Sequence, residues 1–119
     1  MSADRPSALE LIEAVQEFLQ DRAVEKLSGH AAFEARIAAN LLAIASREIQ
    51  QGPKLAADEA AGLEKLLARK GTPEELEAAL VGLIREGDPD ANWDDLVAHL
   101  RRRAENRLRI TNPKYLEES

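Results

Sequence analysis

The segment Phe33–Ile49, FEARIAANLLAIASREI, constrains the fold of this chain more than any other feature. At about 100° per residue, alanines and larger aliphatic side chains cover most of the circumference of a helix drawn through it. A helix that is apolar over most of its circumference normally lies at the centre of a bundle. We therefore expect a central helix from about Ala31 to Gln51, ended by Gly52-Pro53.

Two further segments begin with a capping box, in which a Ser or Thr and a Glu three residues later satisfy the first amides of a helix. Ser7 with Glu10 begins a helix that runs to about Leu27, and Thr72 with Glu75 begins another. The second of these is closed by a glycine and is expected to bury one side, made of Leu76, Leu80, Leu83 and Ile84.

Two more helices complete the expected set. A weaker segment runs from about Asp58 to Arg69, and Asn92 caps a last long helix. The expected core side of that last helix is Trp93, Leu96, Val97, Leu100, Ala104 and Leu108. No segment shows the alternation of a strand. The sequence therefore predicts an all-α, single-domain bundle of about five helices over residues 1–119, with flexible ends at about 1–5 and 117–119.

The composition excludes several classes of function. With 3% aromatic residues, the core must be built from aliphatic side chains, and the absence of cysteine excludes disulfides, thiol catalysis and the usual structural zinc sites. A net charge of -6 argues against nucleic acid as a partner. The chain shows neither a leader-type apolar segment nor an apolar run of membrane-spanning length. We therefore expect a cytoplasmic protein that does not bind membranes.

Three polar side chains interrupt the apolar surface of the expected central helix. Arg36, Asn40 and Arg47 are separated by four and seven residues and therefore line one narrow stripe. Two guanidinium groups and an amide can bind a carboxylate or phosphate group, which suits the two-pronged geometry of arginine. The stripe is also compatible with a solvent-facing side, with pairing to acidic neighbours, or with a subunit contact. These three are the candidate ligand-binding residues.

No motif of a known catalytic class is present. The sequence lacks GxSxG, GxGxxG, the P-loop and HExxH. His30 and His99 are the only side chains that ordinarily titrate near neutrality, and neither has a metal-binding spacing. We interpret His30 as a helix-start residue and His99 as a flank residue of the last long helix. No catalytic residue, metal ligand or cofactor is predicted.

Four stretches resemble an uncharacterised bacterial family of small helical proteins: FEARIAANLLAIASREIQQGP, GTPEELEAALVGLIREGD, NWDDLVAHLRRRAENRL and ITNPKYL. The resemblance covers nearly the whole chain. It implies an all-helical protein encoded near acyl-CoA dehydrogenases and aminoglycoside-phosphotransferase-like kinases. It implies no established activity and no catalytic residues. Arg36 and Asn40 fall in its particular element ARIAAN, and Asn112, Pro113 and Tyr115 in NPKYL.

Two functions follow from these observations. The first is a non-catalytic accessory module that binds a partner protein, such as an enzyme of acyl-CoA or phosphotransfer metabolism, or that associates with itself. The alternative is a small-molecule binder or minor enzyme acting on an anionic metabolite such as an acyl-CoA through Arg36, Asn40 and Arg47. The absence of a catalytic constellation favours the first.

Overall fold

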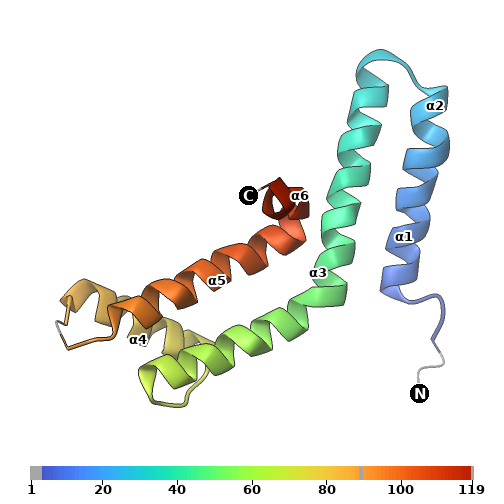
Figure 1. Cartoon of the computed structure of the whole chain (residues 1–119). Helices are drawn as coiled ribbons and strands as arrows, with labels where there is room; N and C mark the ends of the chain where they lie inside the picture. Colours follow the sequence, from blue (N-terminus) through green and yellow to red (C-terminus); the bar gives the residue numbers. More distant parts are fainter. Residues whose placement is uncertain (1–3, 89, 119) are drawn as a thin grey trace. The chain divides into compact units, whose positions relative to one another are not determined.

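The computed structural model describes residues 4–88 and 90–118, and these are almost entirely helical (Figure 1). The first helical segment is continuous and consists of α1 (Ala8–Phe18), the π-helical η1 (Leu19–Ala23) and α2 (Val24–Lys26). It is followed by α3 (Gly29–Leu67), α4 (Pro73–Glu86), α5 (Trp93–Thr111) and α6 (Pro113–Glu118). No strand occurs among the described residues, and the predicted all-α fold class is confirmed.

The predicted helix starts are confirmed by their capping contacts. The Ser7 hydroxyl accepts from the Glu10 amide at 3.1 Å, and the Glu10 carboxylate accepts from the Ser7 amide at 3.0 Å. The same reciprocal pair joins Thr72 and Glu75, at 3.1 and 2.8 Å. These contacts satisfy amides that have no partner within the helix, and so they fix where α1 and α4 begin.

The predicted break at Gly52-Pro53 is wrong, because α3 continues through Pro53 to Leu67. Proline lacks one amide donor and crowds the preceding turn, which weakens a helix without necessarily ending it. Four residues separate Pro53 from Asp58, the next residue that could cap a new helix. Alanine, leucine and lysine there favour helix instead. The two expected helices are therefore one.

The chain divides into two compact units, Met1–Pro53 and Lys54–Ser119, and α3 contributes to both. The prediction of one domain over residues 1–119 stays a prediction. The flexible ends predicted at about 1–5 and 117–119 fall partly on residues 1–3 and 119, which lie outside the described residues.

Unit 1 is a helical hairpin, in which α1, η1 and α2 run antiparallel to the first half of α3 (Figure 1). The buried residues of that half of α3 are all small: Ala32, Ala35, Ala39 and Ser46. The prediction of a central helix is wrong for this unit, because Phe33 and Leu41 are 54% and 61% exposed. One neighbouring helix covers only one side of α3, and that side is the alanine row, which permits close approach of the backbones.

Unit 2 contains the core of large aliphatic side chains. Leu63 from α3, Leu76 and Leu80 from α4, and Leu96 from α5 are buried together. Three half-buried side chains pack against them, namely Leu66, Leu67 and Trp93. The prediction for Leu76 and Leu80 is confirmed, whereas Ile84 is exposed. This core holds α4 and α5 against the second half of α3.

Candidate functional site

The predicted stripe lies on the first half of α3, within unit 1. Arg36 and Asn40 are exposed, and Arg47 is half-buried. Their spacing keeps them on one side of a single helix, so that the structure brings them together only along that helix. Their role as a ligand site stays a prediction.

The buried side of α5 differs from the predicted one. The buried residues of this helix are Leu96, His99, Asn106 and Ile110. At about 100° per residue they define a side roughly a quarter of a turn away from the predicted row, of which Val97 and Leu100 are exposed. The prediction of the α5 core side is therefore wrong except for Leu96 and the half-buried Trp93 and Leu108. Two of the buried positions are occupied by the polar side chains of His99 and Asn106.

Asn106 is the centre of the first set of these contacts. Its side chain is buried, with only 4% of the residue exposed. The amide nitrogen donates to Glu59 Oε2 of α3 at 3.2 Å, and the amide oxygen accepts from Arg109 Nη1 at 2.5 Å. A carboxylate only accepts and a guanidinium only donates, so these two partners together fix the orientation of the amide.

Arg103 is held between two acidic residues from different helices. Its Nη1 donates to both carboxylate oxygens of Glu77 on α4, at 3.2 and 3.1 Å. Its Nε lies 3.7 Å from Glu59 Oε1 on α3. The Arg103 side chain is about one-third exposed. A partly shielded arginine with two carboxylate partners therefore links all three long helices of unit 2.

His99 lies on the same side of α5 and is 4% exposed. Its Nε2 atom is buried and has no hydrogen-bond partner among the described residues. A methyl group at Gly62 of α3 would lie 3.6 Å from Nδ1, so the imidazole packs directly against that helix. Burial lowers the pKa of His99 below its ordinary value, and the positive charges of Arg103 and Arg102 lower it further. The imidazole is therefore neutral at neutral pH.

These polar residues form a structural contact set and not an open catalytic site. Glu59, Asn106 and Arg103 are already engaged with one another or with their neighbours. A general base must come within hydrogen-bond distance of its substrate, and the buried imidazole of His99 offers no such approach. The cluster orients α5 on α3 and α4, and thereby determines which side of α5 faces outward.

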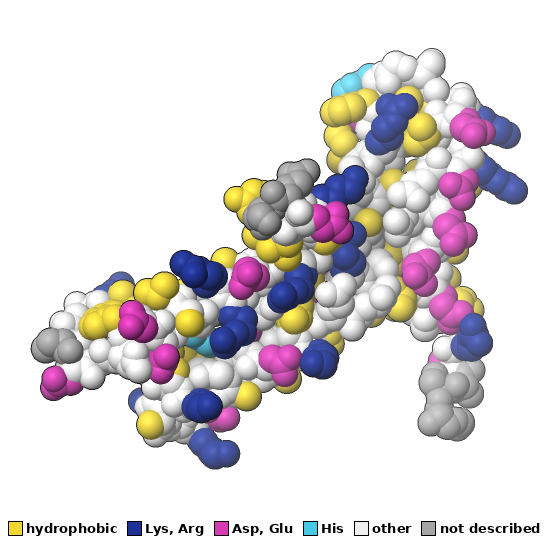
Figure 2. Space-filling model, viewed as in Figure 1, with side chains coloured by type: hydrophobic (Ala, Val, Ile, Leu, Met, Phe, Trp, Pro, Cys, Tyr) yellow, Lys and Arg dark blue, Asp and Glu magenta, His cyan; other side chains and the backbone are white. Residues whose placement is uncertain are grey.

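One exposed flank of α5, roughly a quarter of a turn from its buried side, is apolar. Val97, Leu100 and Ala104 are exposed, and Leu108 is half-buried. Their spacing of three, four and four residues makes a continuous row along the helix. Figure 2 shows Lys and Arg side chains gathered along this helix. Arg101 and Arg107 border this row on its two sides. We call Val97, Leu100, Ala104 and Leu108 the outer row.

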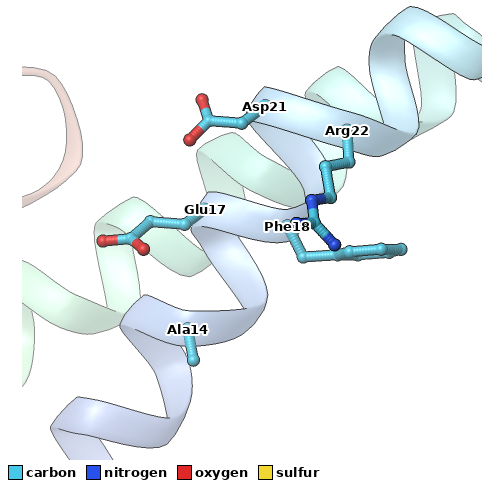
Figure 3. A pocket seen from close by; sticks show the side chains of 5 residues that line it. All are labelled: Ala14, Glu17, Phe18, Asp21 and Arg22. Atoms are coloured by element: carbon cyan, nitrogen blue, oxygen red, sulfur yellow. The ribbon is translucent and has the colours of Figure 1, made fainter.

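A shallow depression occurs on the first helical segment of unit 1 (Figure 3). Its lining residues all belong to α1 and η1: Ala14, Glu17, Phe18, Asp21 and Arg22. Figure 3 shows Glu17 and Asp21 extending to one side of the helix, whereas Arg22 reaches toward the Phe18 ring on the other. Since a single helical segment lines it, the depression does not enclose a ligand.

Metal-binding and membrane-spanning features do not occur among the described residues. No group of three His, Cys, Asp or Glu side chains there is arranged to hold a metal ion. Within the same ranges, none of the helices combines the length and the apolar character needed to cross a membrane.

The chain belongs to the family DUF6285, a domain of unknown function, which matches residues 25–115. The matched residues include α3, α4 and α5 entirely, whereas α1 precedes them. Neither the curated proteins nor the solved structures contain a match to this chain.

The polar cluster of unit 2 was missed by reasoning from the sequence. The signal for it was present, because His99, Arg103 and Asn106 repeat at spacings of four and three and so share one side of a helix. Apolar periodicity outweighed that signal, since buried polar residues are the exception in protein cores. The partner Glu59 lies 47 residues away from Asn106 and could not be identified from spacing.

Proposed function

We propose that this protein is a non-catalytic helical module that binds a partner protein through the outer row of α5. The supporting observation is that α5 buries the polar His99 and Asn106 beside Leu96 and Ile110, while it exposes the apolar Val97 and Leu100. Val97 is 51% exposed, whereas the polar Asn106 on the same helix is 4% exposed. A monomeric domain ordinarily has the reverse arrangement.

The spacing of the outer row suits recognition of one helix by a groove. Helices that dock in grooves present apolar anchors at positions i, i+3 and i+7, and Val97, Leu100 and Ala104 have this spacing. The row lies on a helix whose buried side is fixed by the Leu core and by Arg103. A rigid helix loses little conformational freedom on binding, which favours affinity.

The charges beside the outer row indicate the character of the partner. Arg101 and Arg107 border the row and are exposed. A complementary groove would have an apolar floor and acidic edges, because opposite charges at the rim favour association and exclude wrong partners. The whole chain carries a net charge of -6, so this basic helix differs in sign from the rest of the molecule.

The sequence resemblance provides the first partners to try. It implies genes for acyl-CoA dehydrogenases and aminoglycoside-phosphotransferase-like kinases in the neighbourhood, and an accessory role beside one of these enzymes is the finer form of the proposal. The outer row lies within the residues matched by the family, whereas α1 does not. A role shared across the family can therefore use the outer row, whereas α1 is outside the matched residues.

The proposal is tested with two variants that place the same charge at matched positions. Val97→Glu alters the outer row, whereas Val15→Glu alters an equally exposed valine, at 50%, on α1 of unit 1. Partners retained by the wild-type protein in its native host are identified, purified and titrated by calorimetry. We expect Val97→Glu to weaken binding by about tenfold or more, and Val15→Glu to leave it unchanged.

Two results would contradict this proposal. One is a purified partner that binds wild type and Val97→Glu with the same affinity. The other is retention of no partner at all, including the two candidate enzymes offered directly. Circular dichroism of both variants provides the check that each is folded.

A further inference from the structure

We propose that the first helical segment is a detachable strap, which swings away from α3 about a hinge at Leu27–Gly29 while unit 2 stays folded. The strap consists of α1, η1 and α2, over residues 8–26. Its release uncovers one side of the first half of α3, the small-residue row, which consists of Ala32, Ala35, Ala39 and Ser46. No residue of the outer row takes part, so the strap is independent of the proposed function.

The contact between the strap and α3 buries few large side chains. None of the residues of α1, η1 or α2 is buried. The strap instead has a half-buried row, spaced by three and four residues: Leu9, Ile12, Gln16, Leu19 and Ala23. The small-residue row of α3 adds only three methyl groups and a hydroxymethyl group. Because burial of apolar area supplies most of the stability of a helix in a protein, this contact is weak.

Unit 2 is held together by larger contacts. Its three long helices bury four leucines against one another: Leu63, Leu76, Leu80 and Leu96. Arg103 adds ion pairs to Glu77 and Glu59 on two different helices. Regions with few buried apolar contacts open at a lower free energy than the core does. The strap is therefore expected to leave α3 before unit 2 unfolds.

The strap also contains an irregular turn. η1 is π-helical over Leu19–Ala23, and the Val24 amide donates to the carbonyl oxygen of Leu19, five residues earlier. Such turns are rare, and they interrupt the regular hydrogen bonds to the residue four positions earlier. A short helix is only marginally stable without a neighbour. A strap that has left α3 therefore loses much of its helical structure, and its amides exchange with solvent.

The hinge is the short connection between the strap and α3. Leu27 has an extended backbone, and Gly29 has a φ of +61°. Glycine adopts a positive φ readily, whereas other residues do so at a cost. Apart from its chain neighbours, no atom of the described residues would lie within 4 Å of a Cβ at Gly29. The closed hairpin therefore depends on the backbone freedom of Gly29 and not on packing around it.

The boundary of the family match falls at this hinge. The match covers residues 25–115, so that it includes the small-residue row and leaves α1 and η1 outside. The row thus belongs to the matched domain, whereas most of the element that covers it precedes that domain. This division agrees with a strap that is separable from the rest of the fold.

The first test compares two glycines of the same backbone conformation by hydrogen exchange of the full chain. Gly29 has a φ of +61°, and Gly87, which closes α4 in unit 2, has a φ of +62°. In wild type we expect amides of the strap to exchange at least about tenfold faster than those of α4 and α5. Gly29→Ala should accelerate the strap about tenfold further and leave α4 and α5 unchanged, and Gly87→Ala should do the reverse.

A buried thiol reports directly on release of the strap. The protein has no cysteine, and Ser46→Cys places one thiol of similar size on the covered side of α3, at a residue that is 6% exposed. The Ser46 hydroxyl accepts from Gln50 of the same helix at 3.1 Å, a contact that does not involve the strap. We expect a maleimide to label this thiol slowly, about tenfold faster with Gly29→Ala, and at an unchanged rate with Gly87→Ala.

Two results would overturn the proposal. The first is a wild-type protein in which the strap exchanges as slowly as α4 and α5, because the strap and unit 2 would then open together. This comparison needs no variant. The second is a rapidly exchanging strap with a Ser46→Cys thiol that Gly29→Ala does not expose, because the helix would then fray without leaving α3.

Discussion

The side-chain amide of Asn106 donates to Glu59 at 3.2 Å and so links α5 to the second half of α3 across 47 residues of sequence. The same carboxylate lies 3.7 Å from Arg103, which also pairs with Glu77 of α4. Both polar partners of the link are at least partly shielded from water. Such contacts contribute little to net stability when complete, but cost much when one member is removed.

Replacement of Asn106 by alanine should therefore destabilise unit 2. The variant leaves Glu59 without its amide donor and removes the acceptor of Arg109. We expect the free energy of unfolding to fall by about 1–3 kcal/mol. The measurement is urea unfolding followed by the fluorescence of Trp93, which is the only tryptophan of the chain and packs on the unit 2 core.

The exposed Asn40 provides the matched control for this experiment. Asn40→Ala removes the same side chain from a helix surface in unit 1, and should change the free energy of unfolding followed by Trp93 fluorescence by no more than about 0.5 kcal/mol. Equal effects of the two substitutions would show that Asn106 is not held as described.

The stability of unit 2 should depend on the protonation of His99. Its pKa is lowered in the folded state, mainly by burial and further by Arg103 and Arg102, while Glu59 and Glu77 oppose the shift. The unfolded chain then binds the proton more readily than the folded one. The contribution of the neutral His99 to the free energy of unfolding is therefore fully present above the unfolded pKa of about 6.5. It decreases as the pH falls through and below that value.

The pH profile is checked with the two histidines of the chain. We expect His99→Gln to lose part of the decrease in unfolding free energy that wild type shows between about pH 7 and pH 5. His30→Gln is the control, because the His30 side chain is 80% exposed. An unchanged slope in His99→Gln would mean that the imidazole is accessible to protons in the folded protein.

The positions of the helices could be predicted wherever a cap defines a start. Ser7, Thr72 and Asn92 act through contacts with residues three positions away, which the sequence displays directly. Helix ends marked by a breaker were less reliable, since Gly52-Pro53 weakens α3 without ending it. A breaker ends a helix only if the following residues offer a competing structure, and here they favour helix.

The exposed and buried sides could not be predicted in the same way. Apolar periodicity identifies a side that is able to pack, but the number of neighbouring helices decides whether it does. Phe33 and Val97 both lie on apolar rows and are both exposed. The interior side of α5 depends on Glu59 and Glu77, which come from distant segments. The candidate stripe of Arg36, Asn40 and Arg47 remains a prediction from spacing.

The continuity of α3 can be tested by Pro53→Ala. The substitution restores one amide donor inside an existing helix, and relieves the crowding of the ring against the preceding turn. Proline is less favourable than alanine there by about 3 kcal/mol, and part of this is offset by the greater freedom of the unfolded chain. We expect the free energy of unfolding to rise by roughly 1–2 kcal/mol.

The far-ultraviolet circular dichroism of Pro53→Ala provides the second measurement. A helix that already continues through Pro53 gains almost no helical signal when the proline is removed. If Gly52-Pro53 separated two helices in solution, the variant would instead become measurably more helical than wild type. That gain would contradict the continuous α3 of Figure 1.

The last prediction concerns the anion-binding alternative. Arg36 and Asn40 are exposed on one helix, where a charged contact is screened by water and is worth about 0–1 kcal/mol. A shielded anion site would provide about 1.5–3 kcal/mol for each charged hydrogen bond. We therefore expect inorganic phosphate, ATP, coenzyme A and acetyl-CoA to leave the thermal unfolding midpoint of wild type unchanged. A stabilisation that is lost in Arg36→Ala and retained in Arg101→Ala would contradict this expectation and would support a small-molecule binder, because Arg101 is an equally charged, exposed residue outside the stripe.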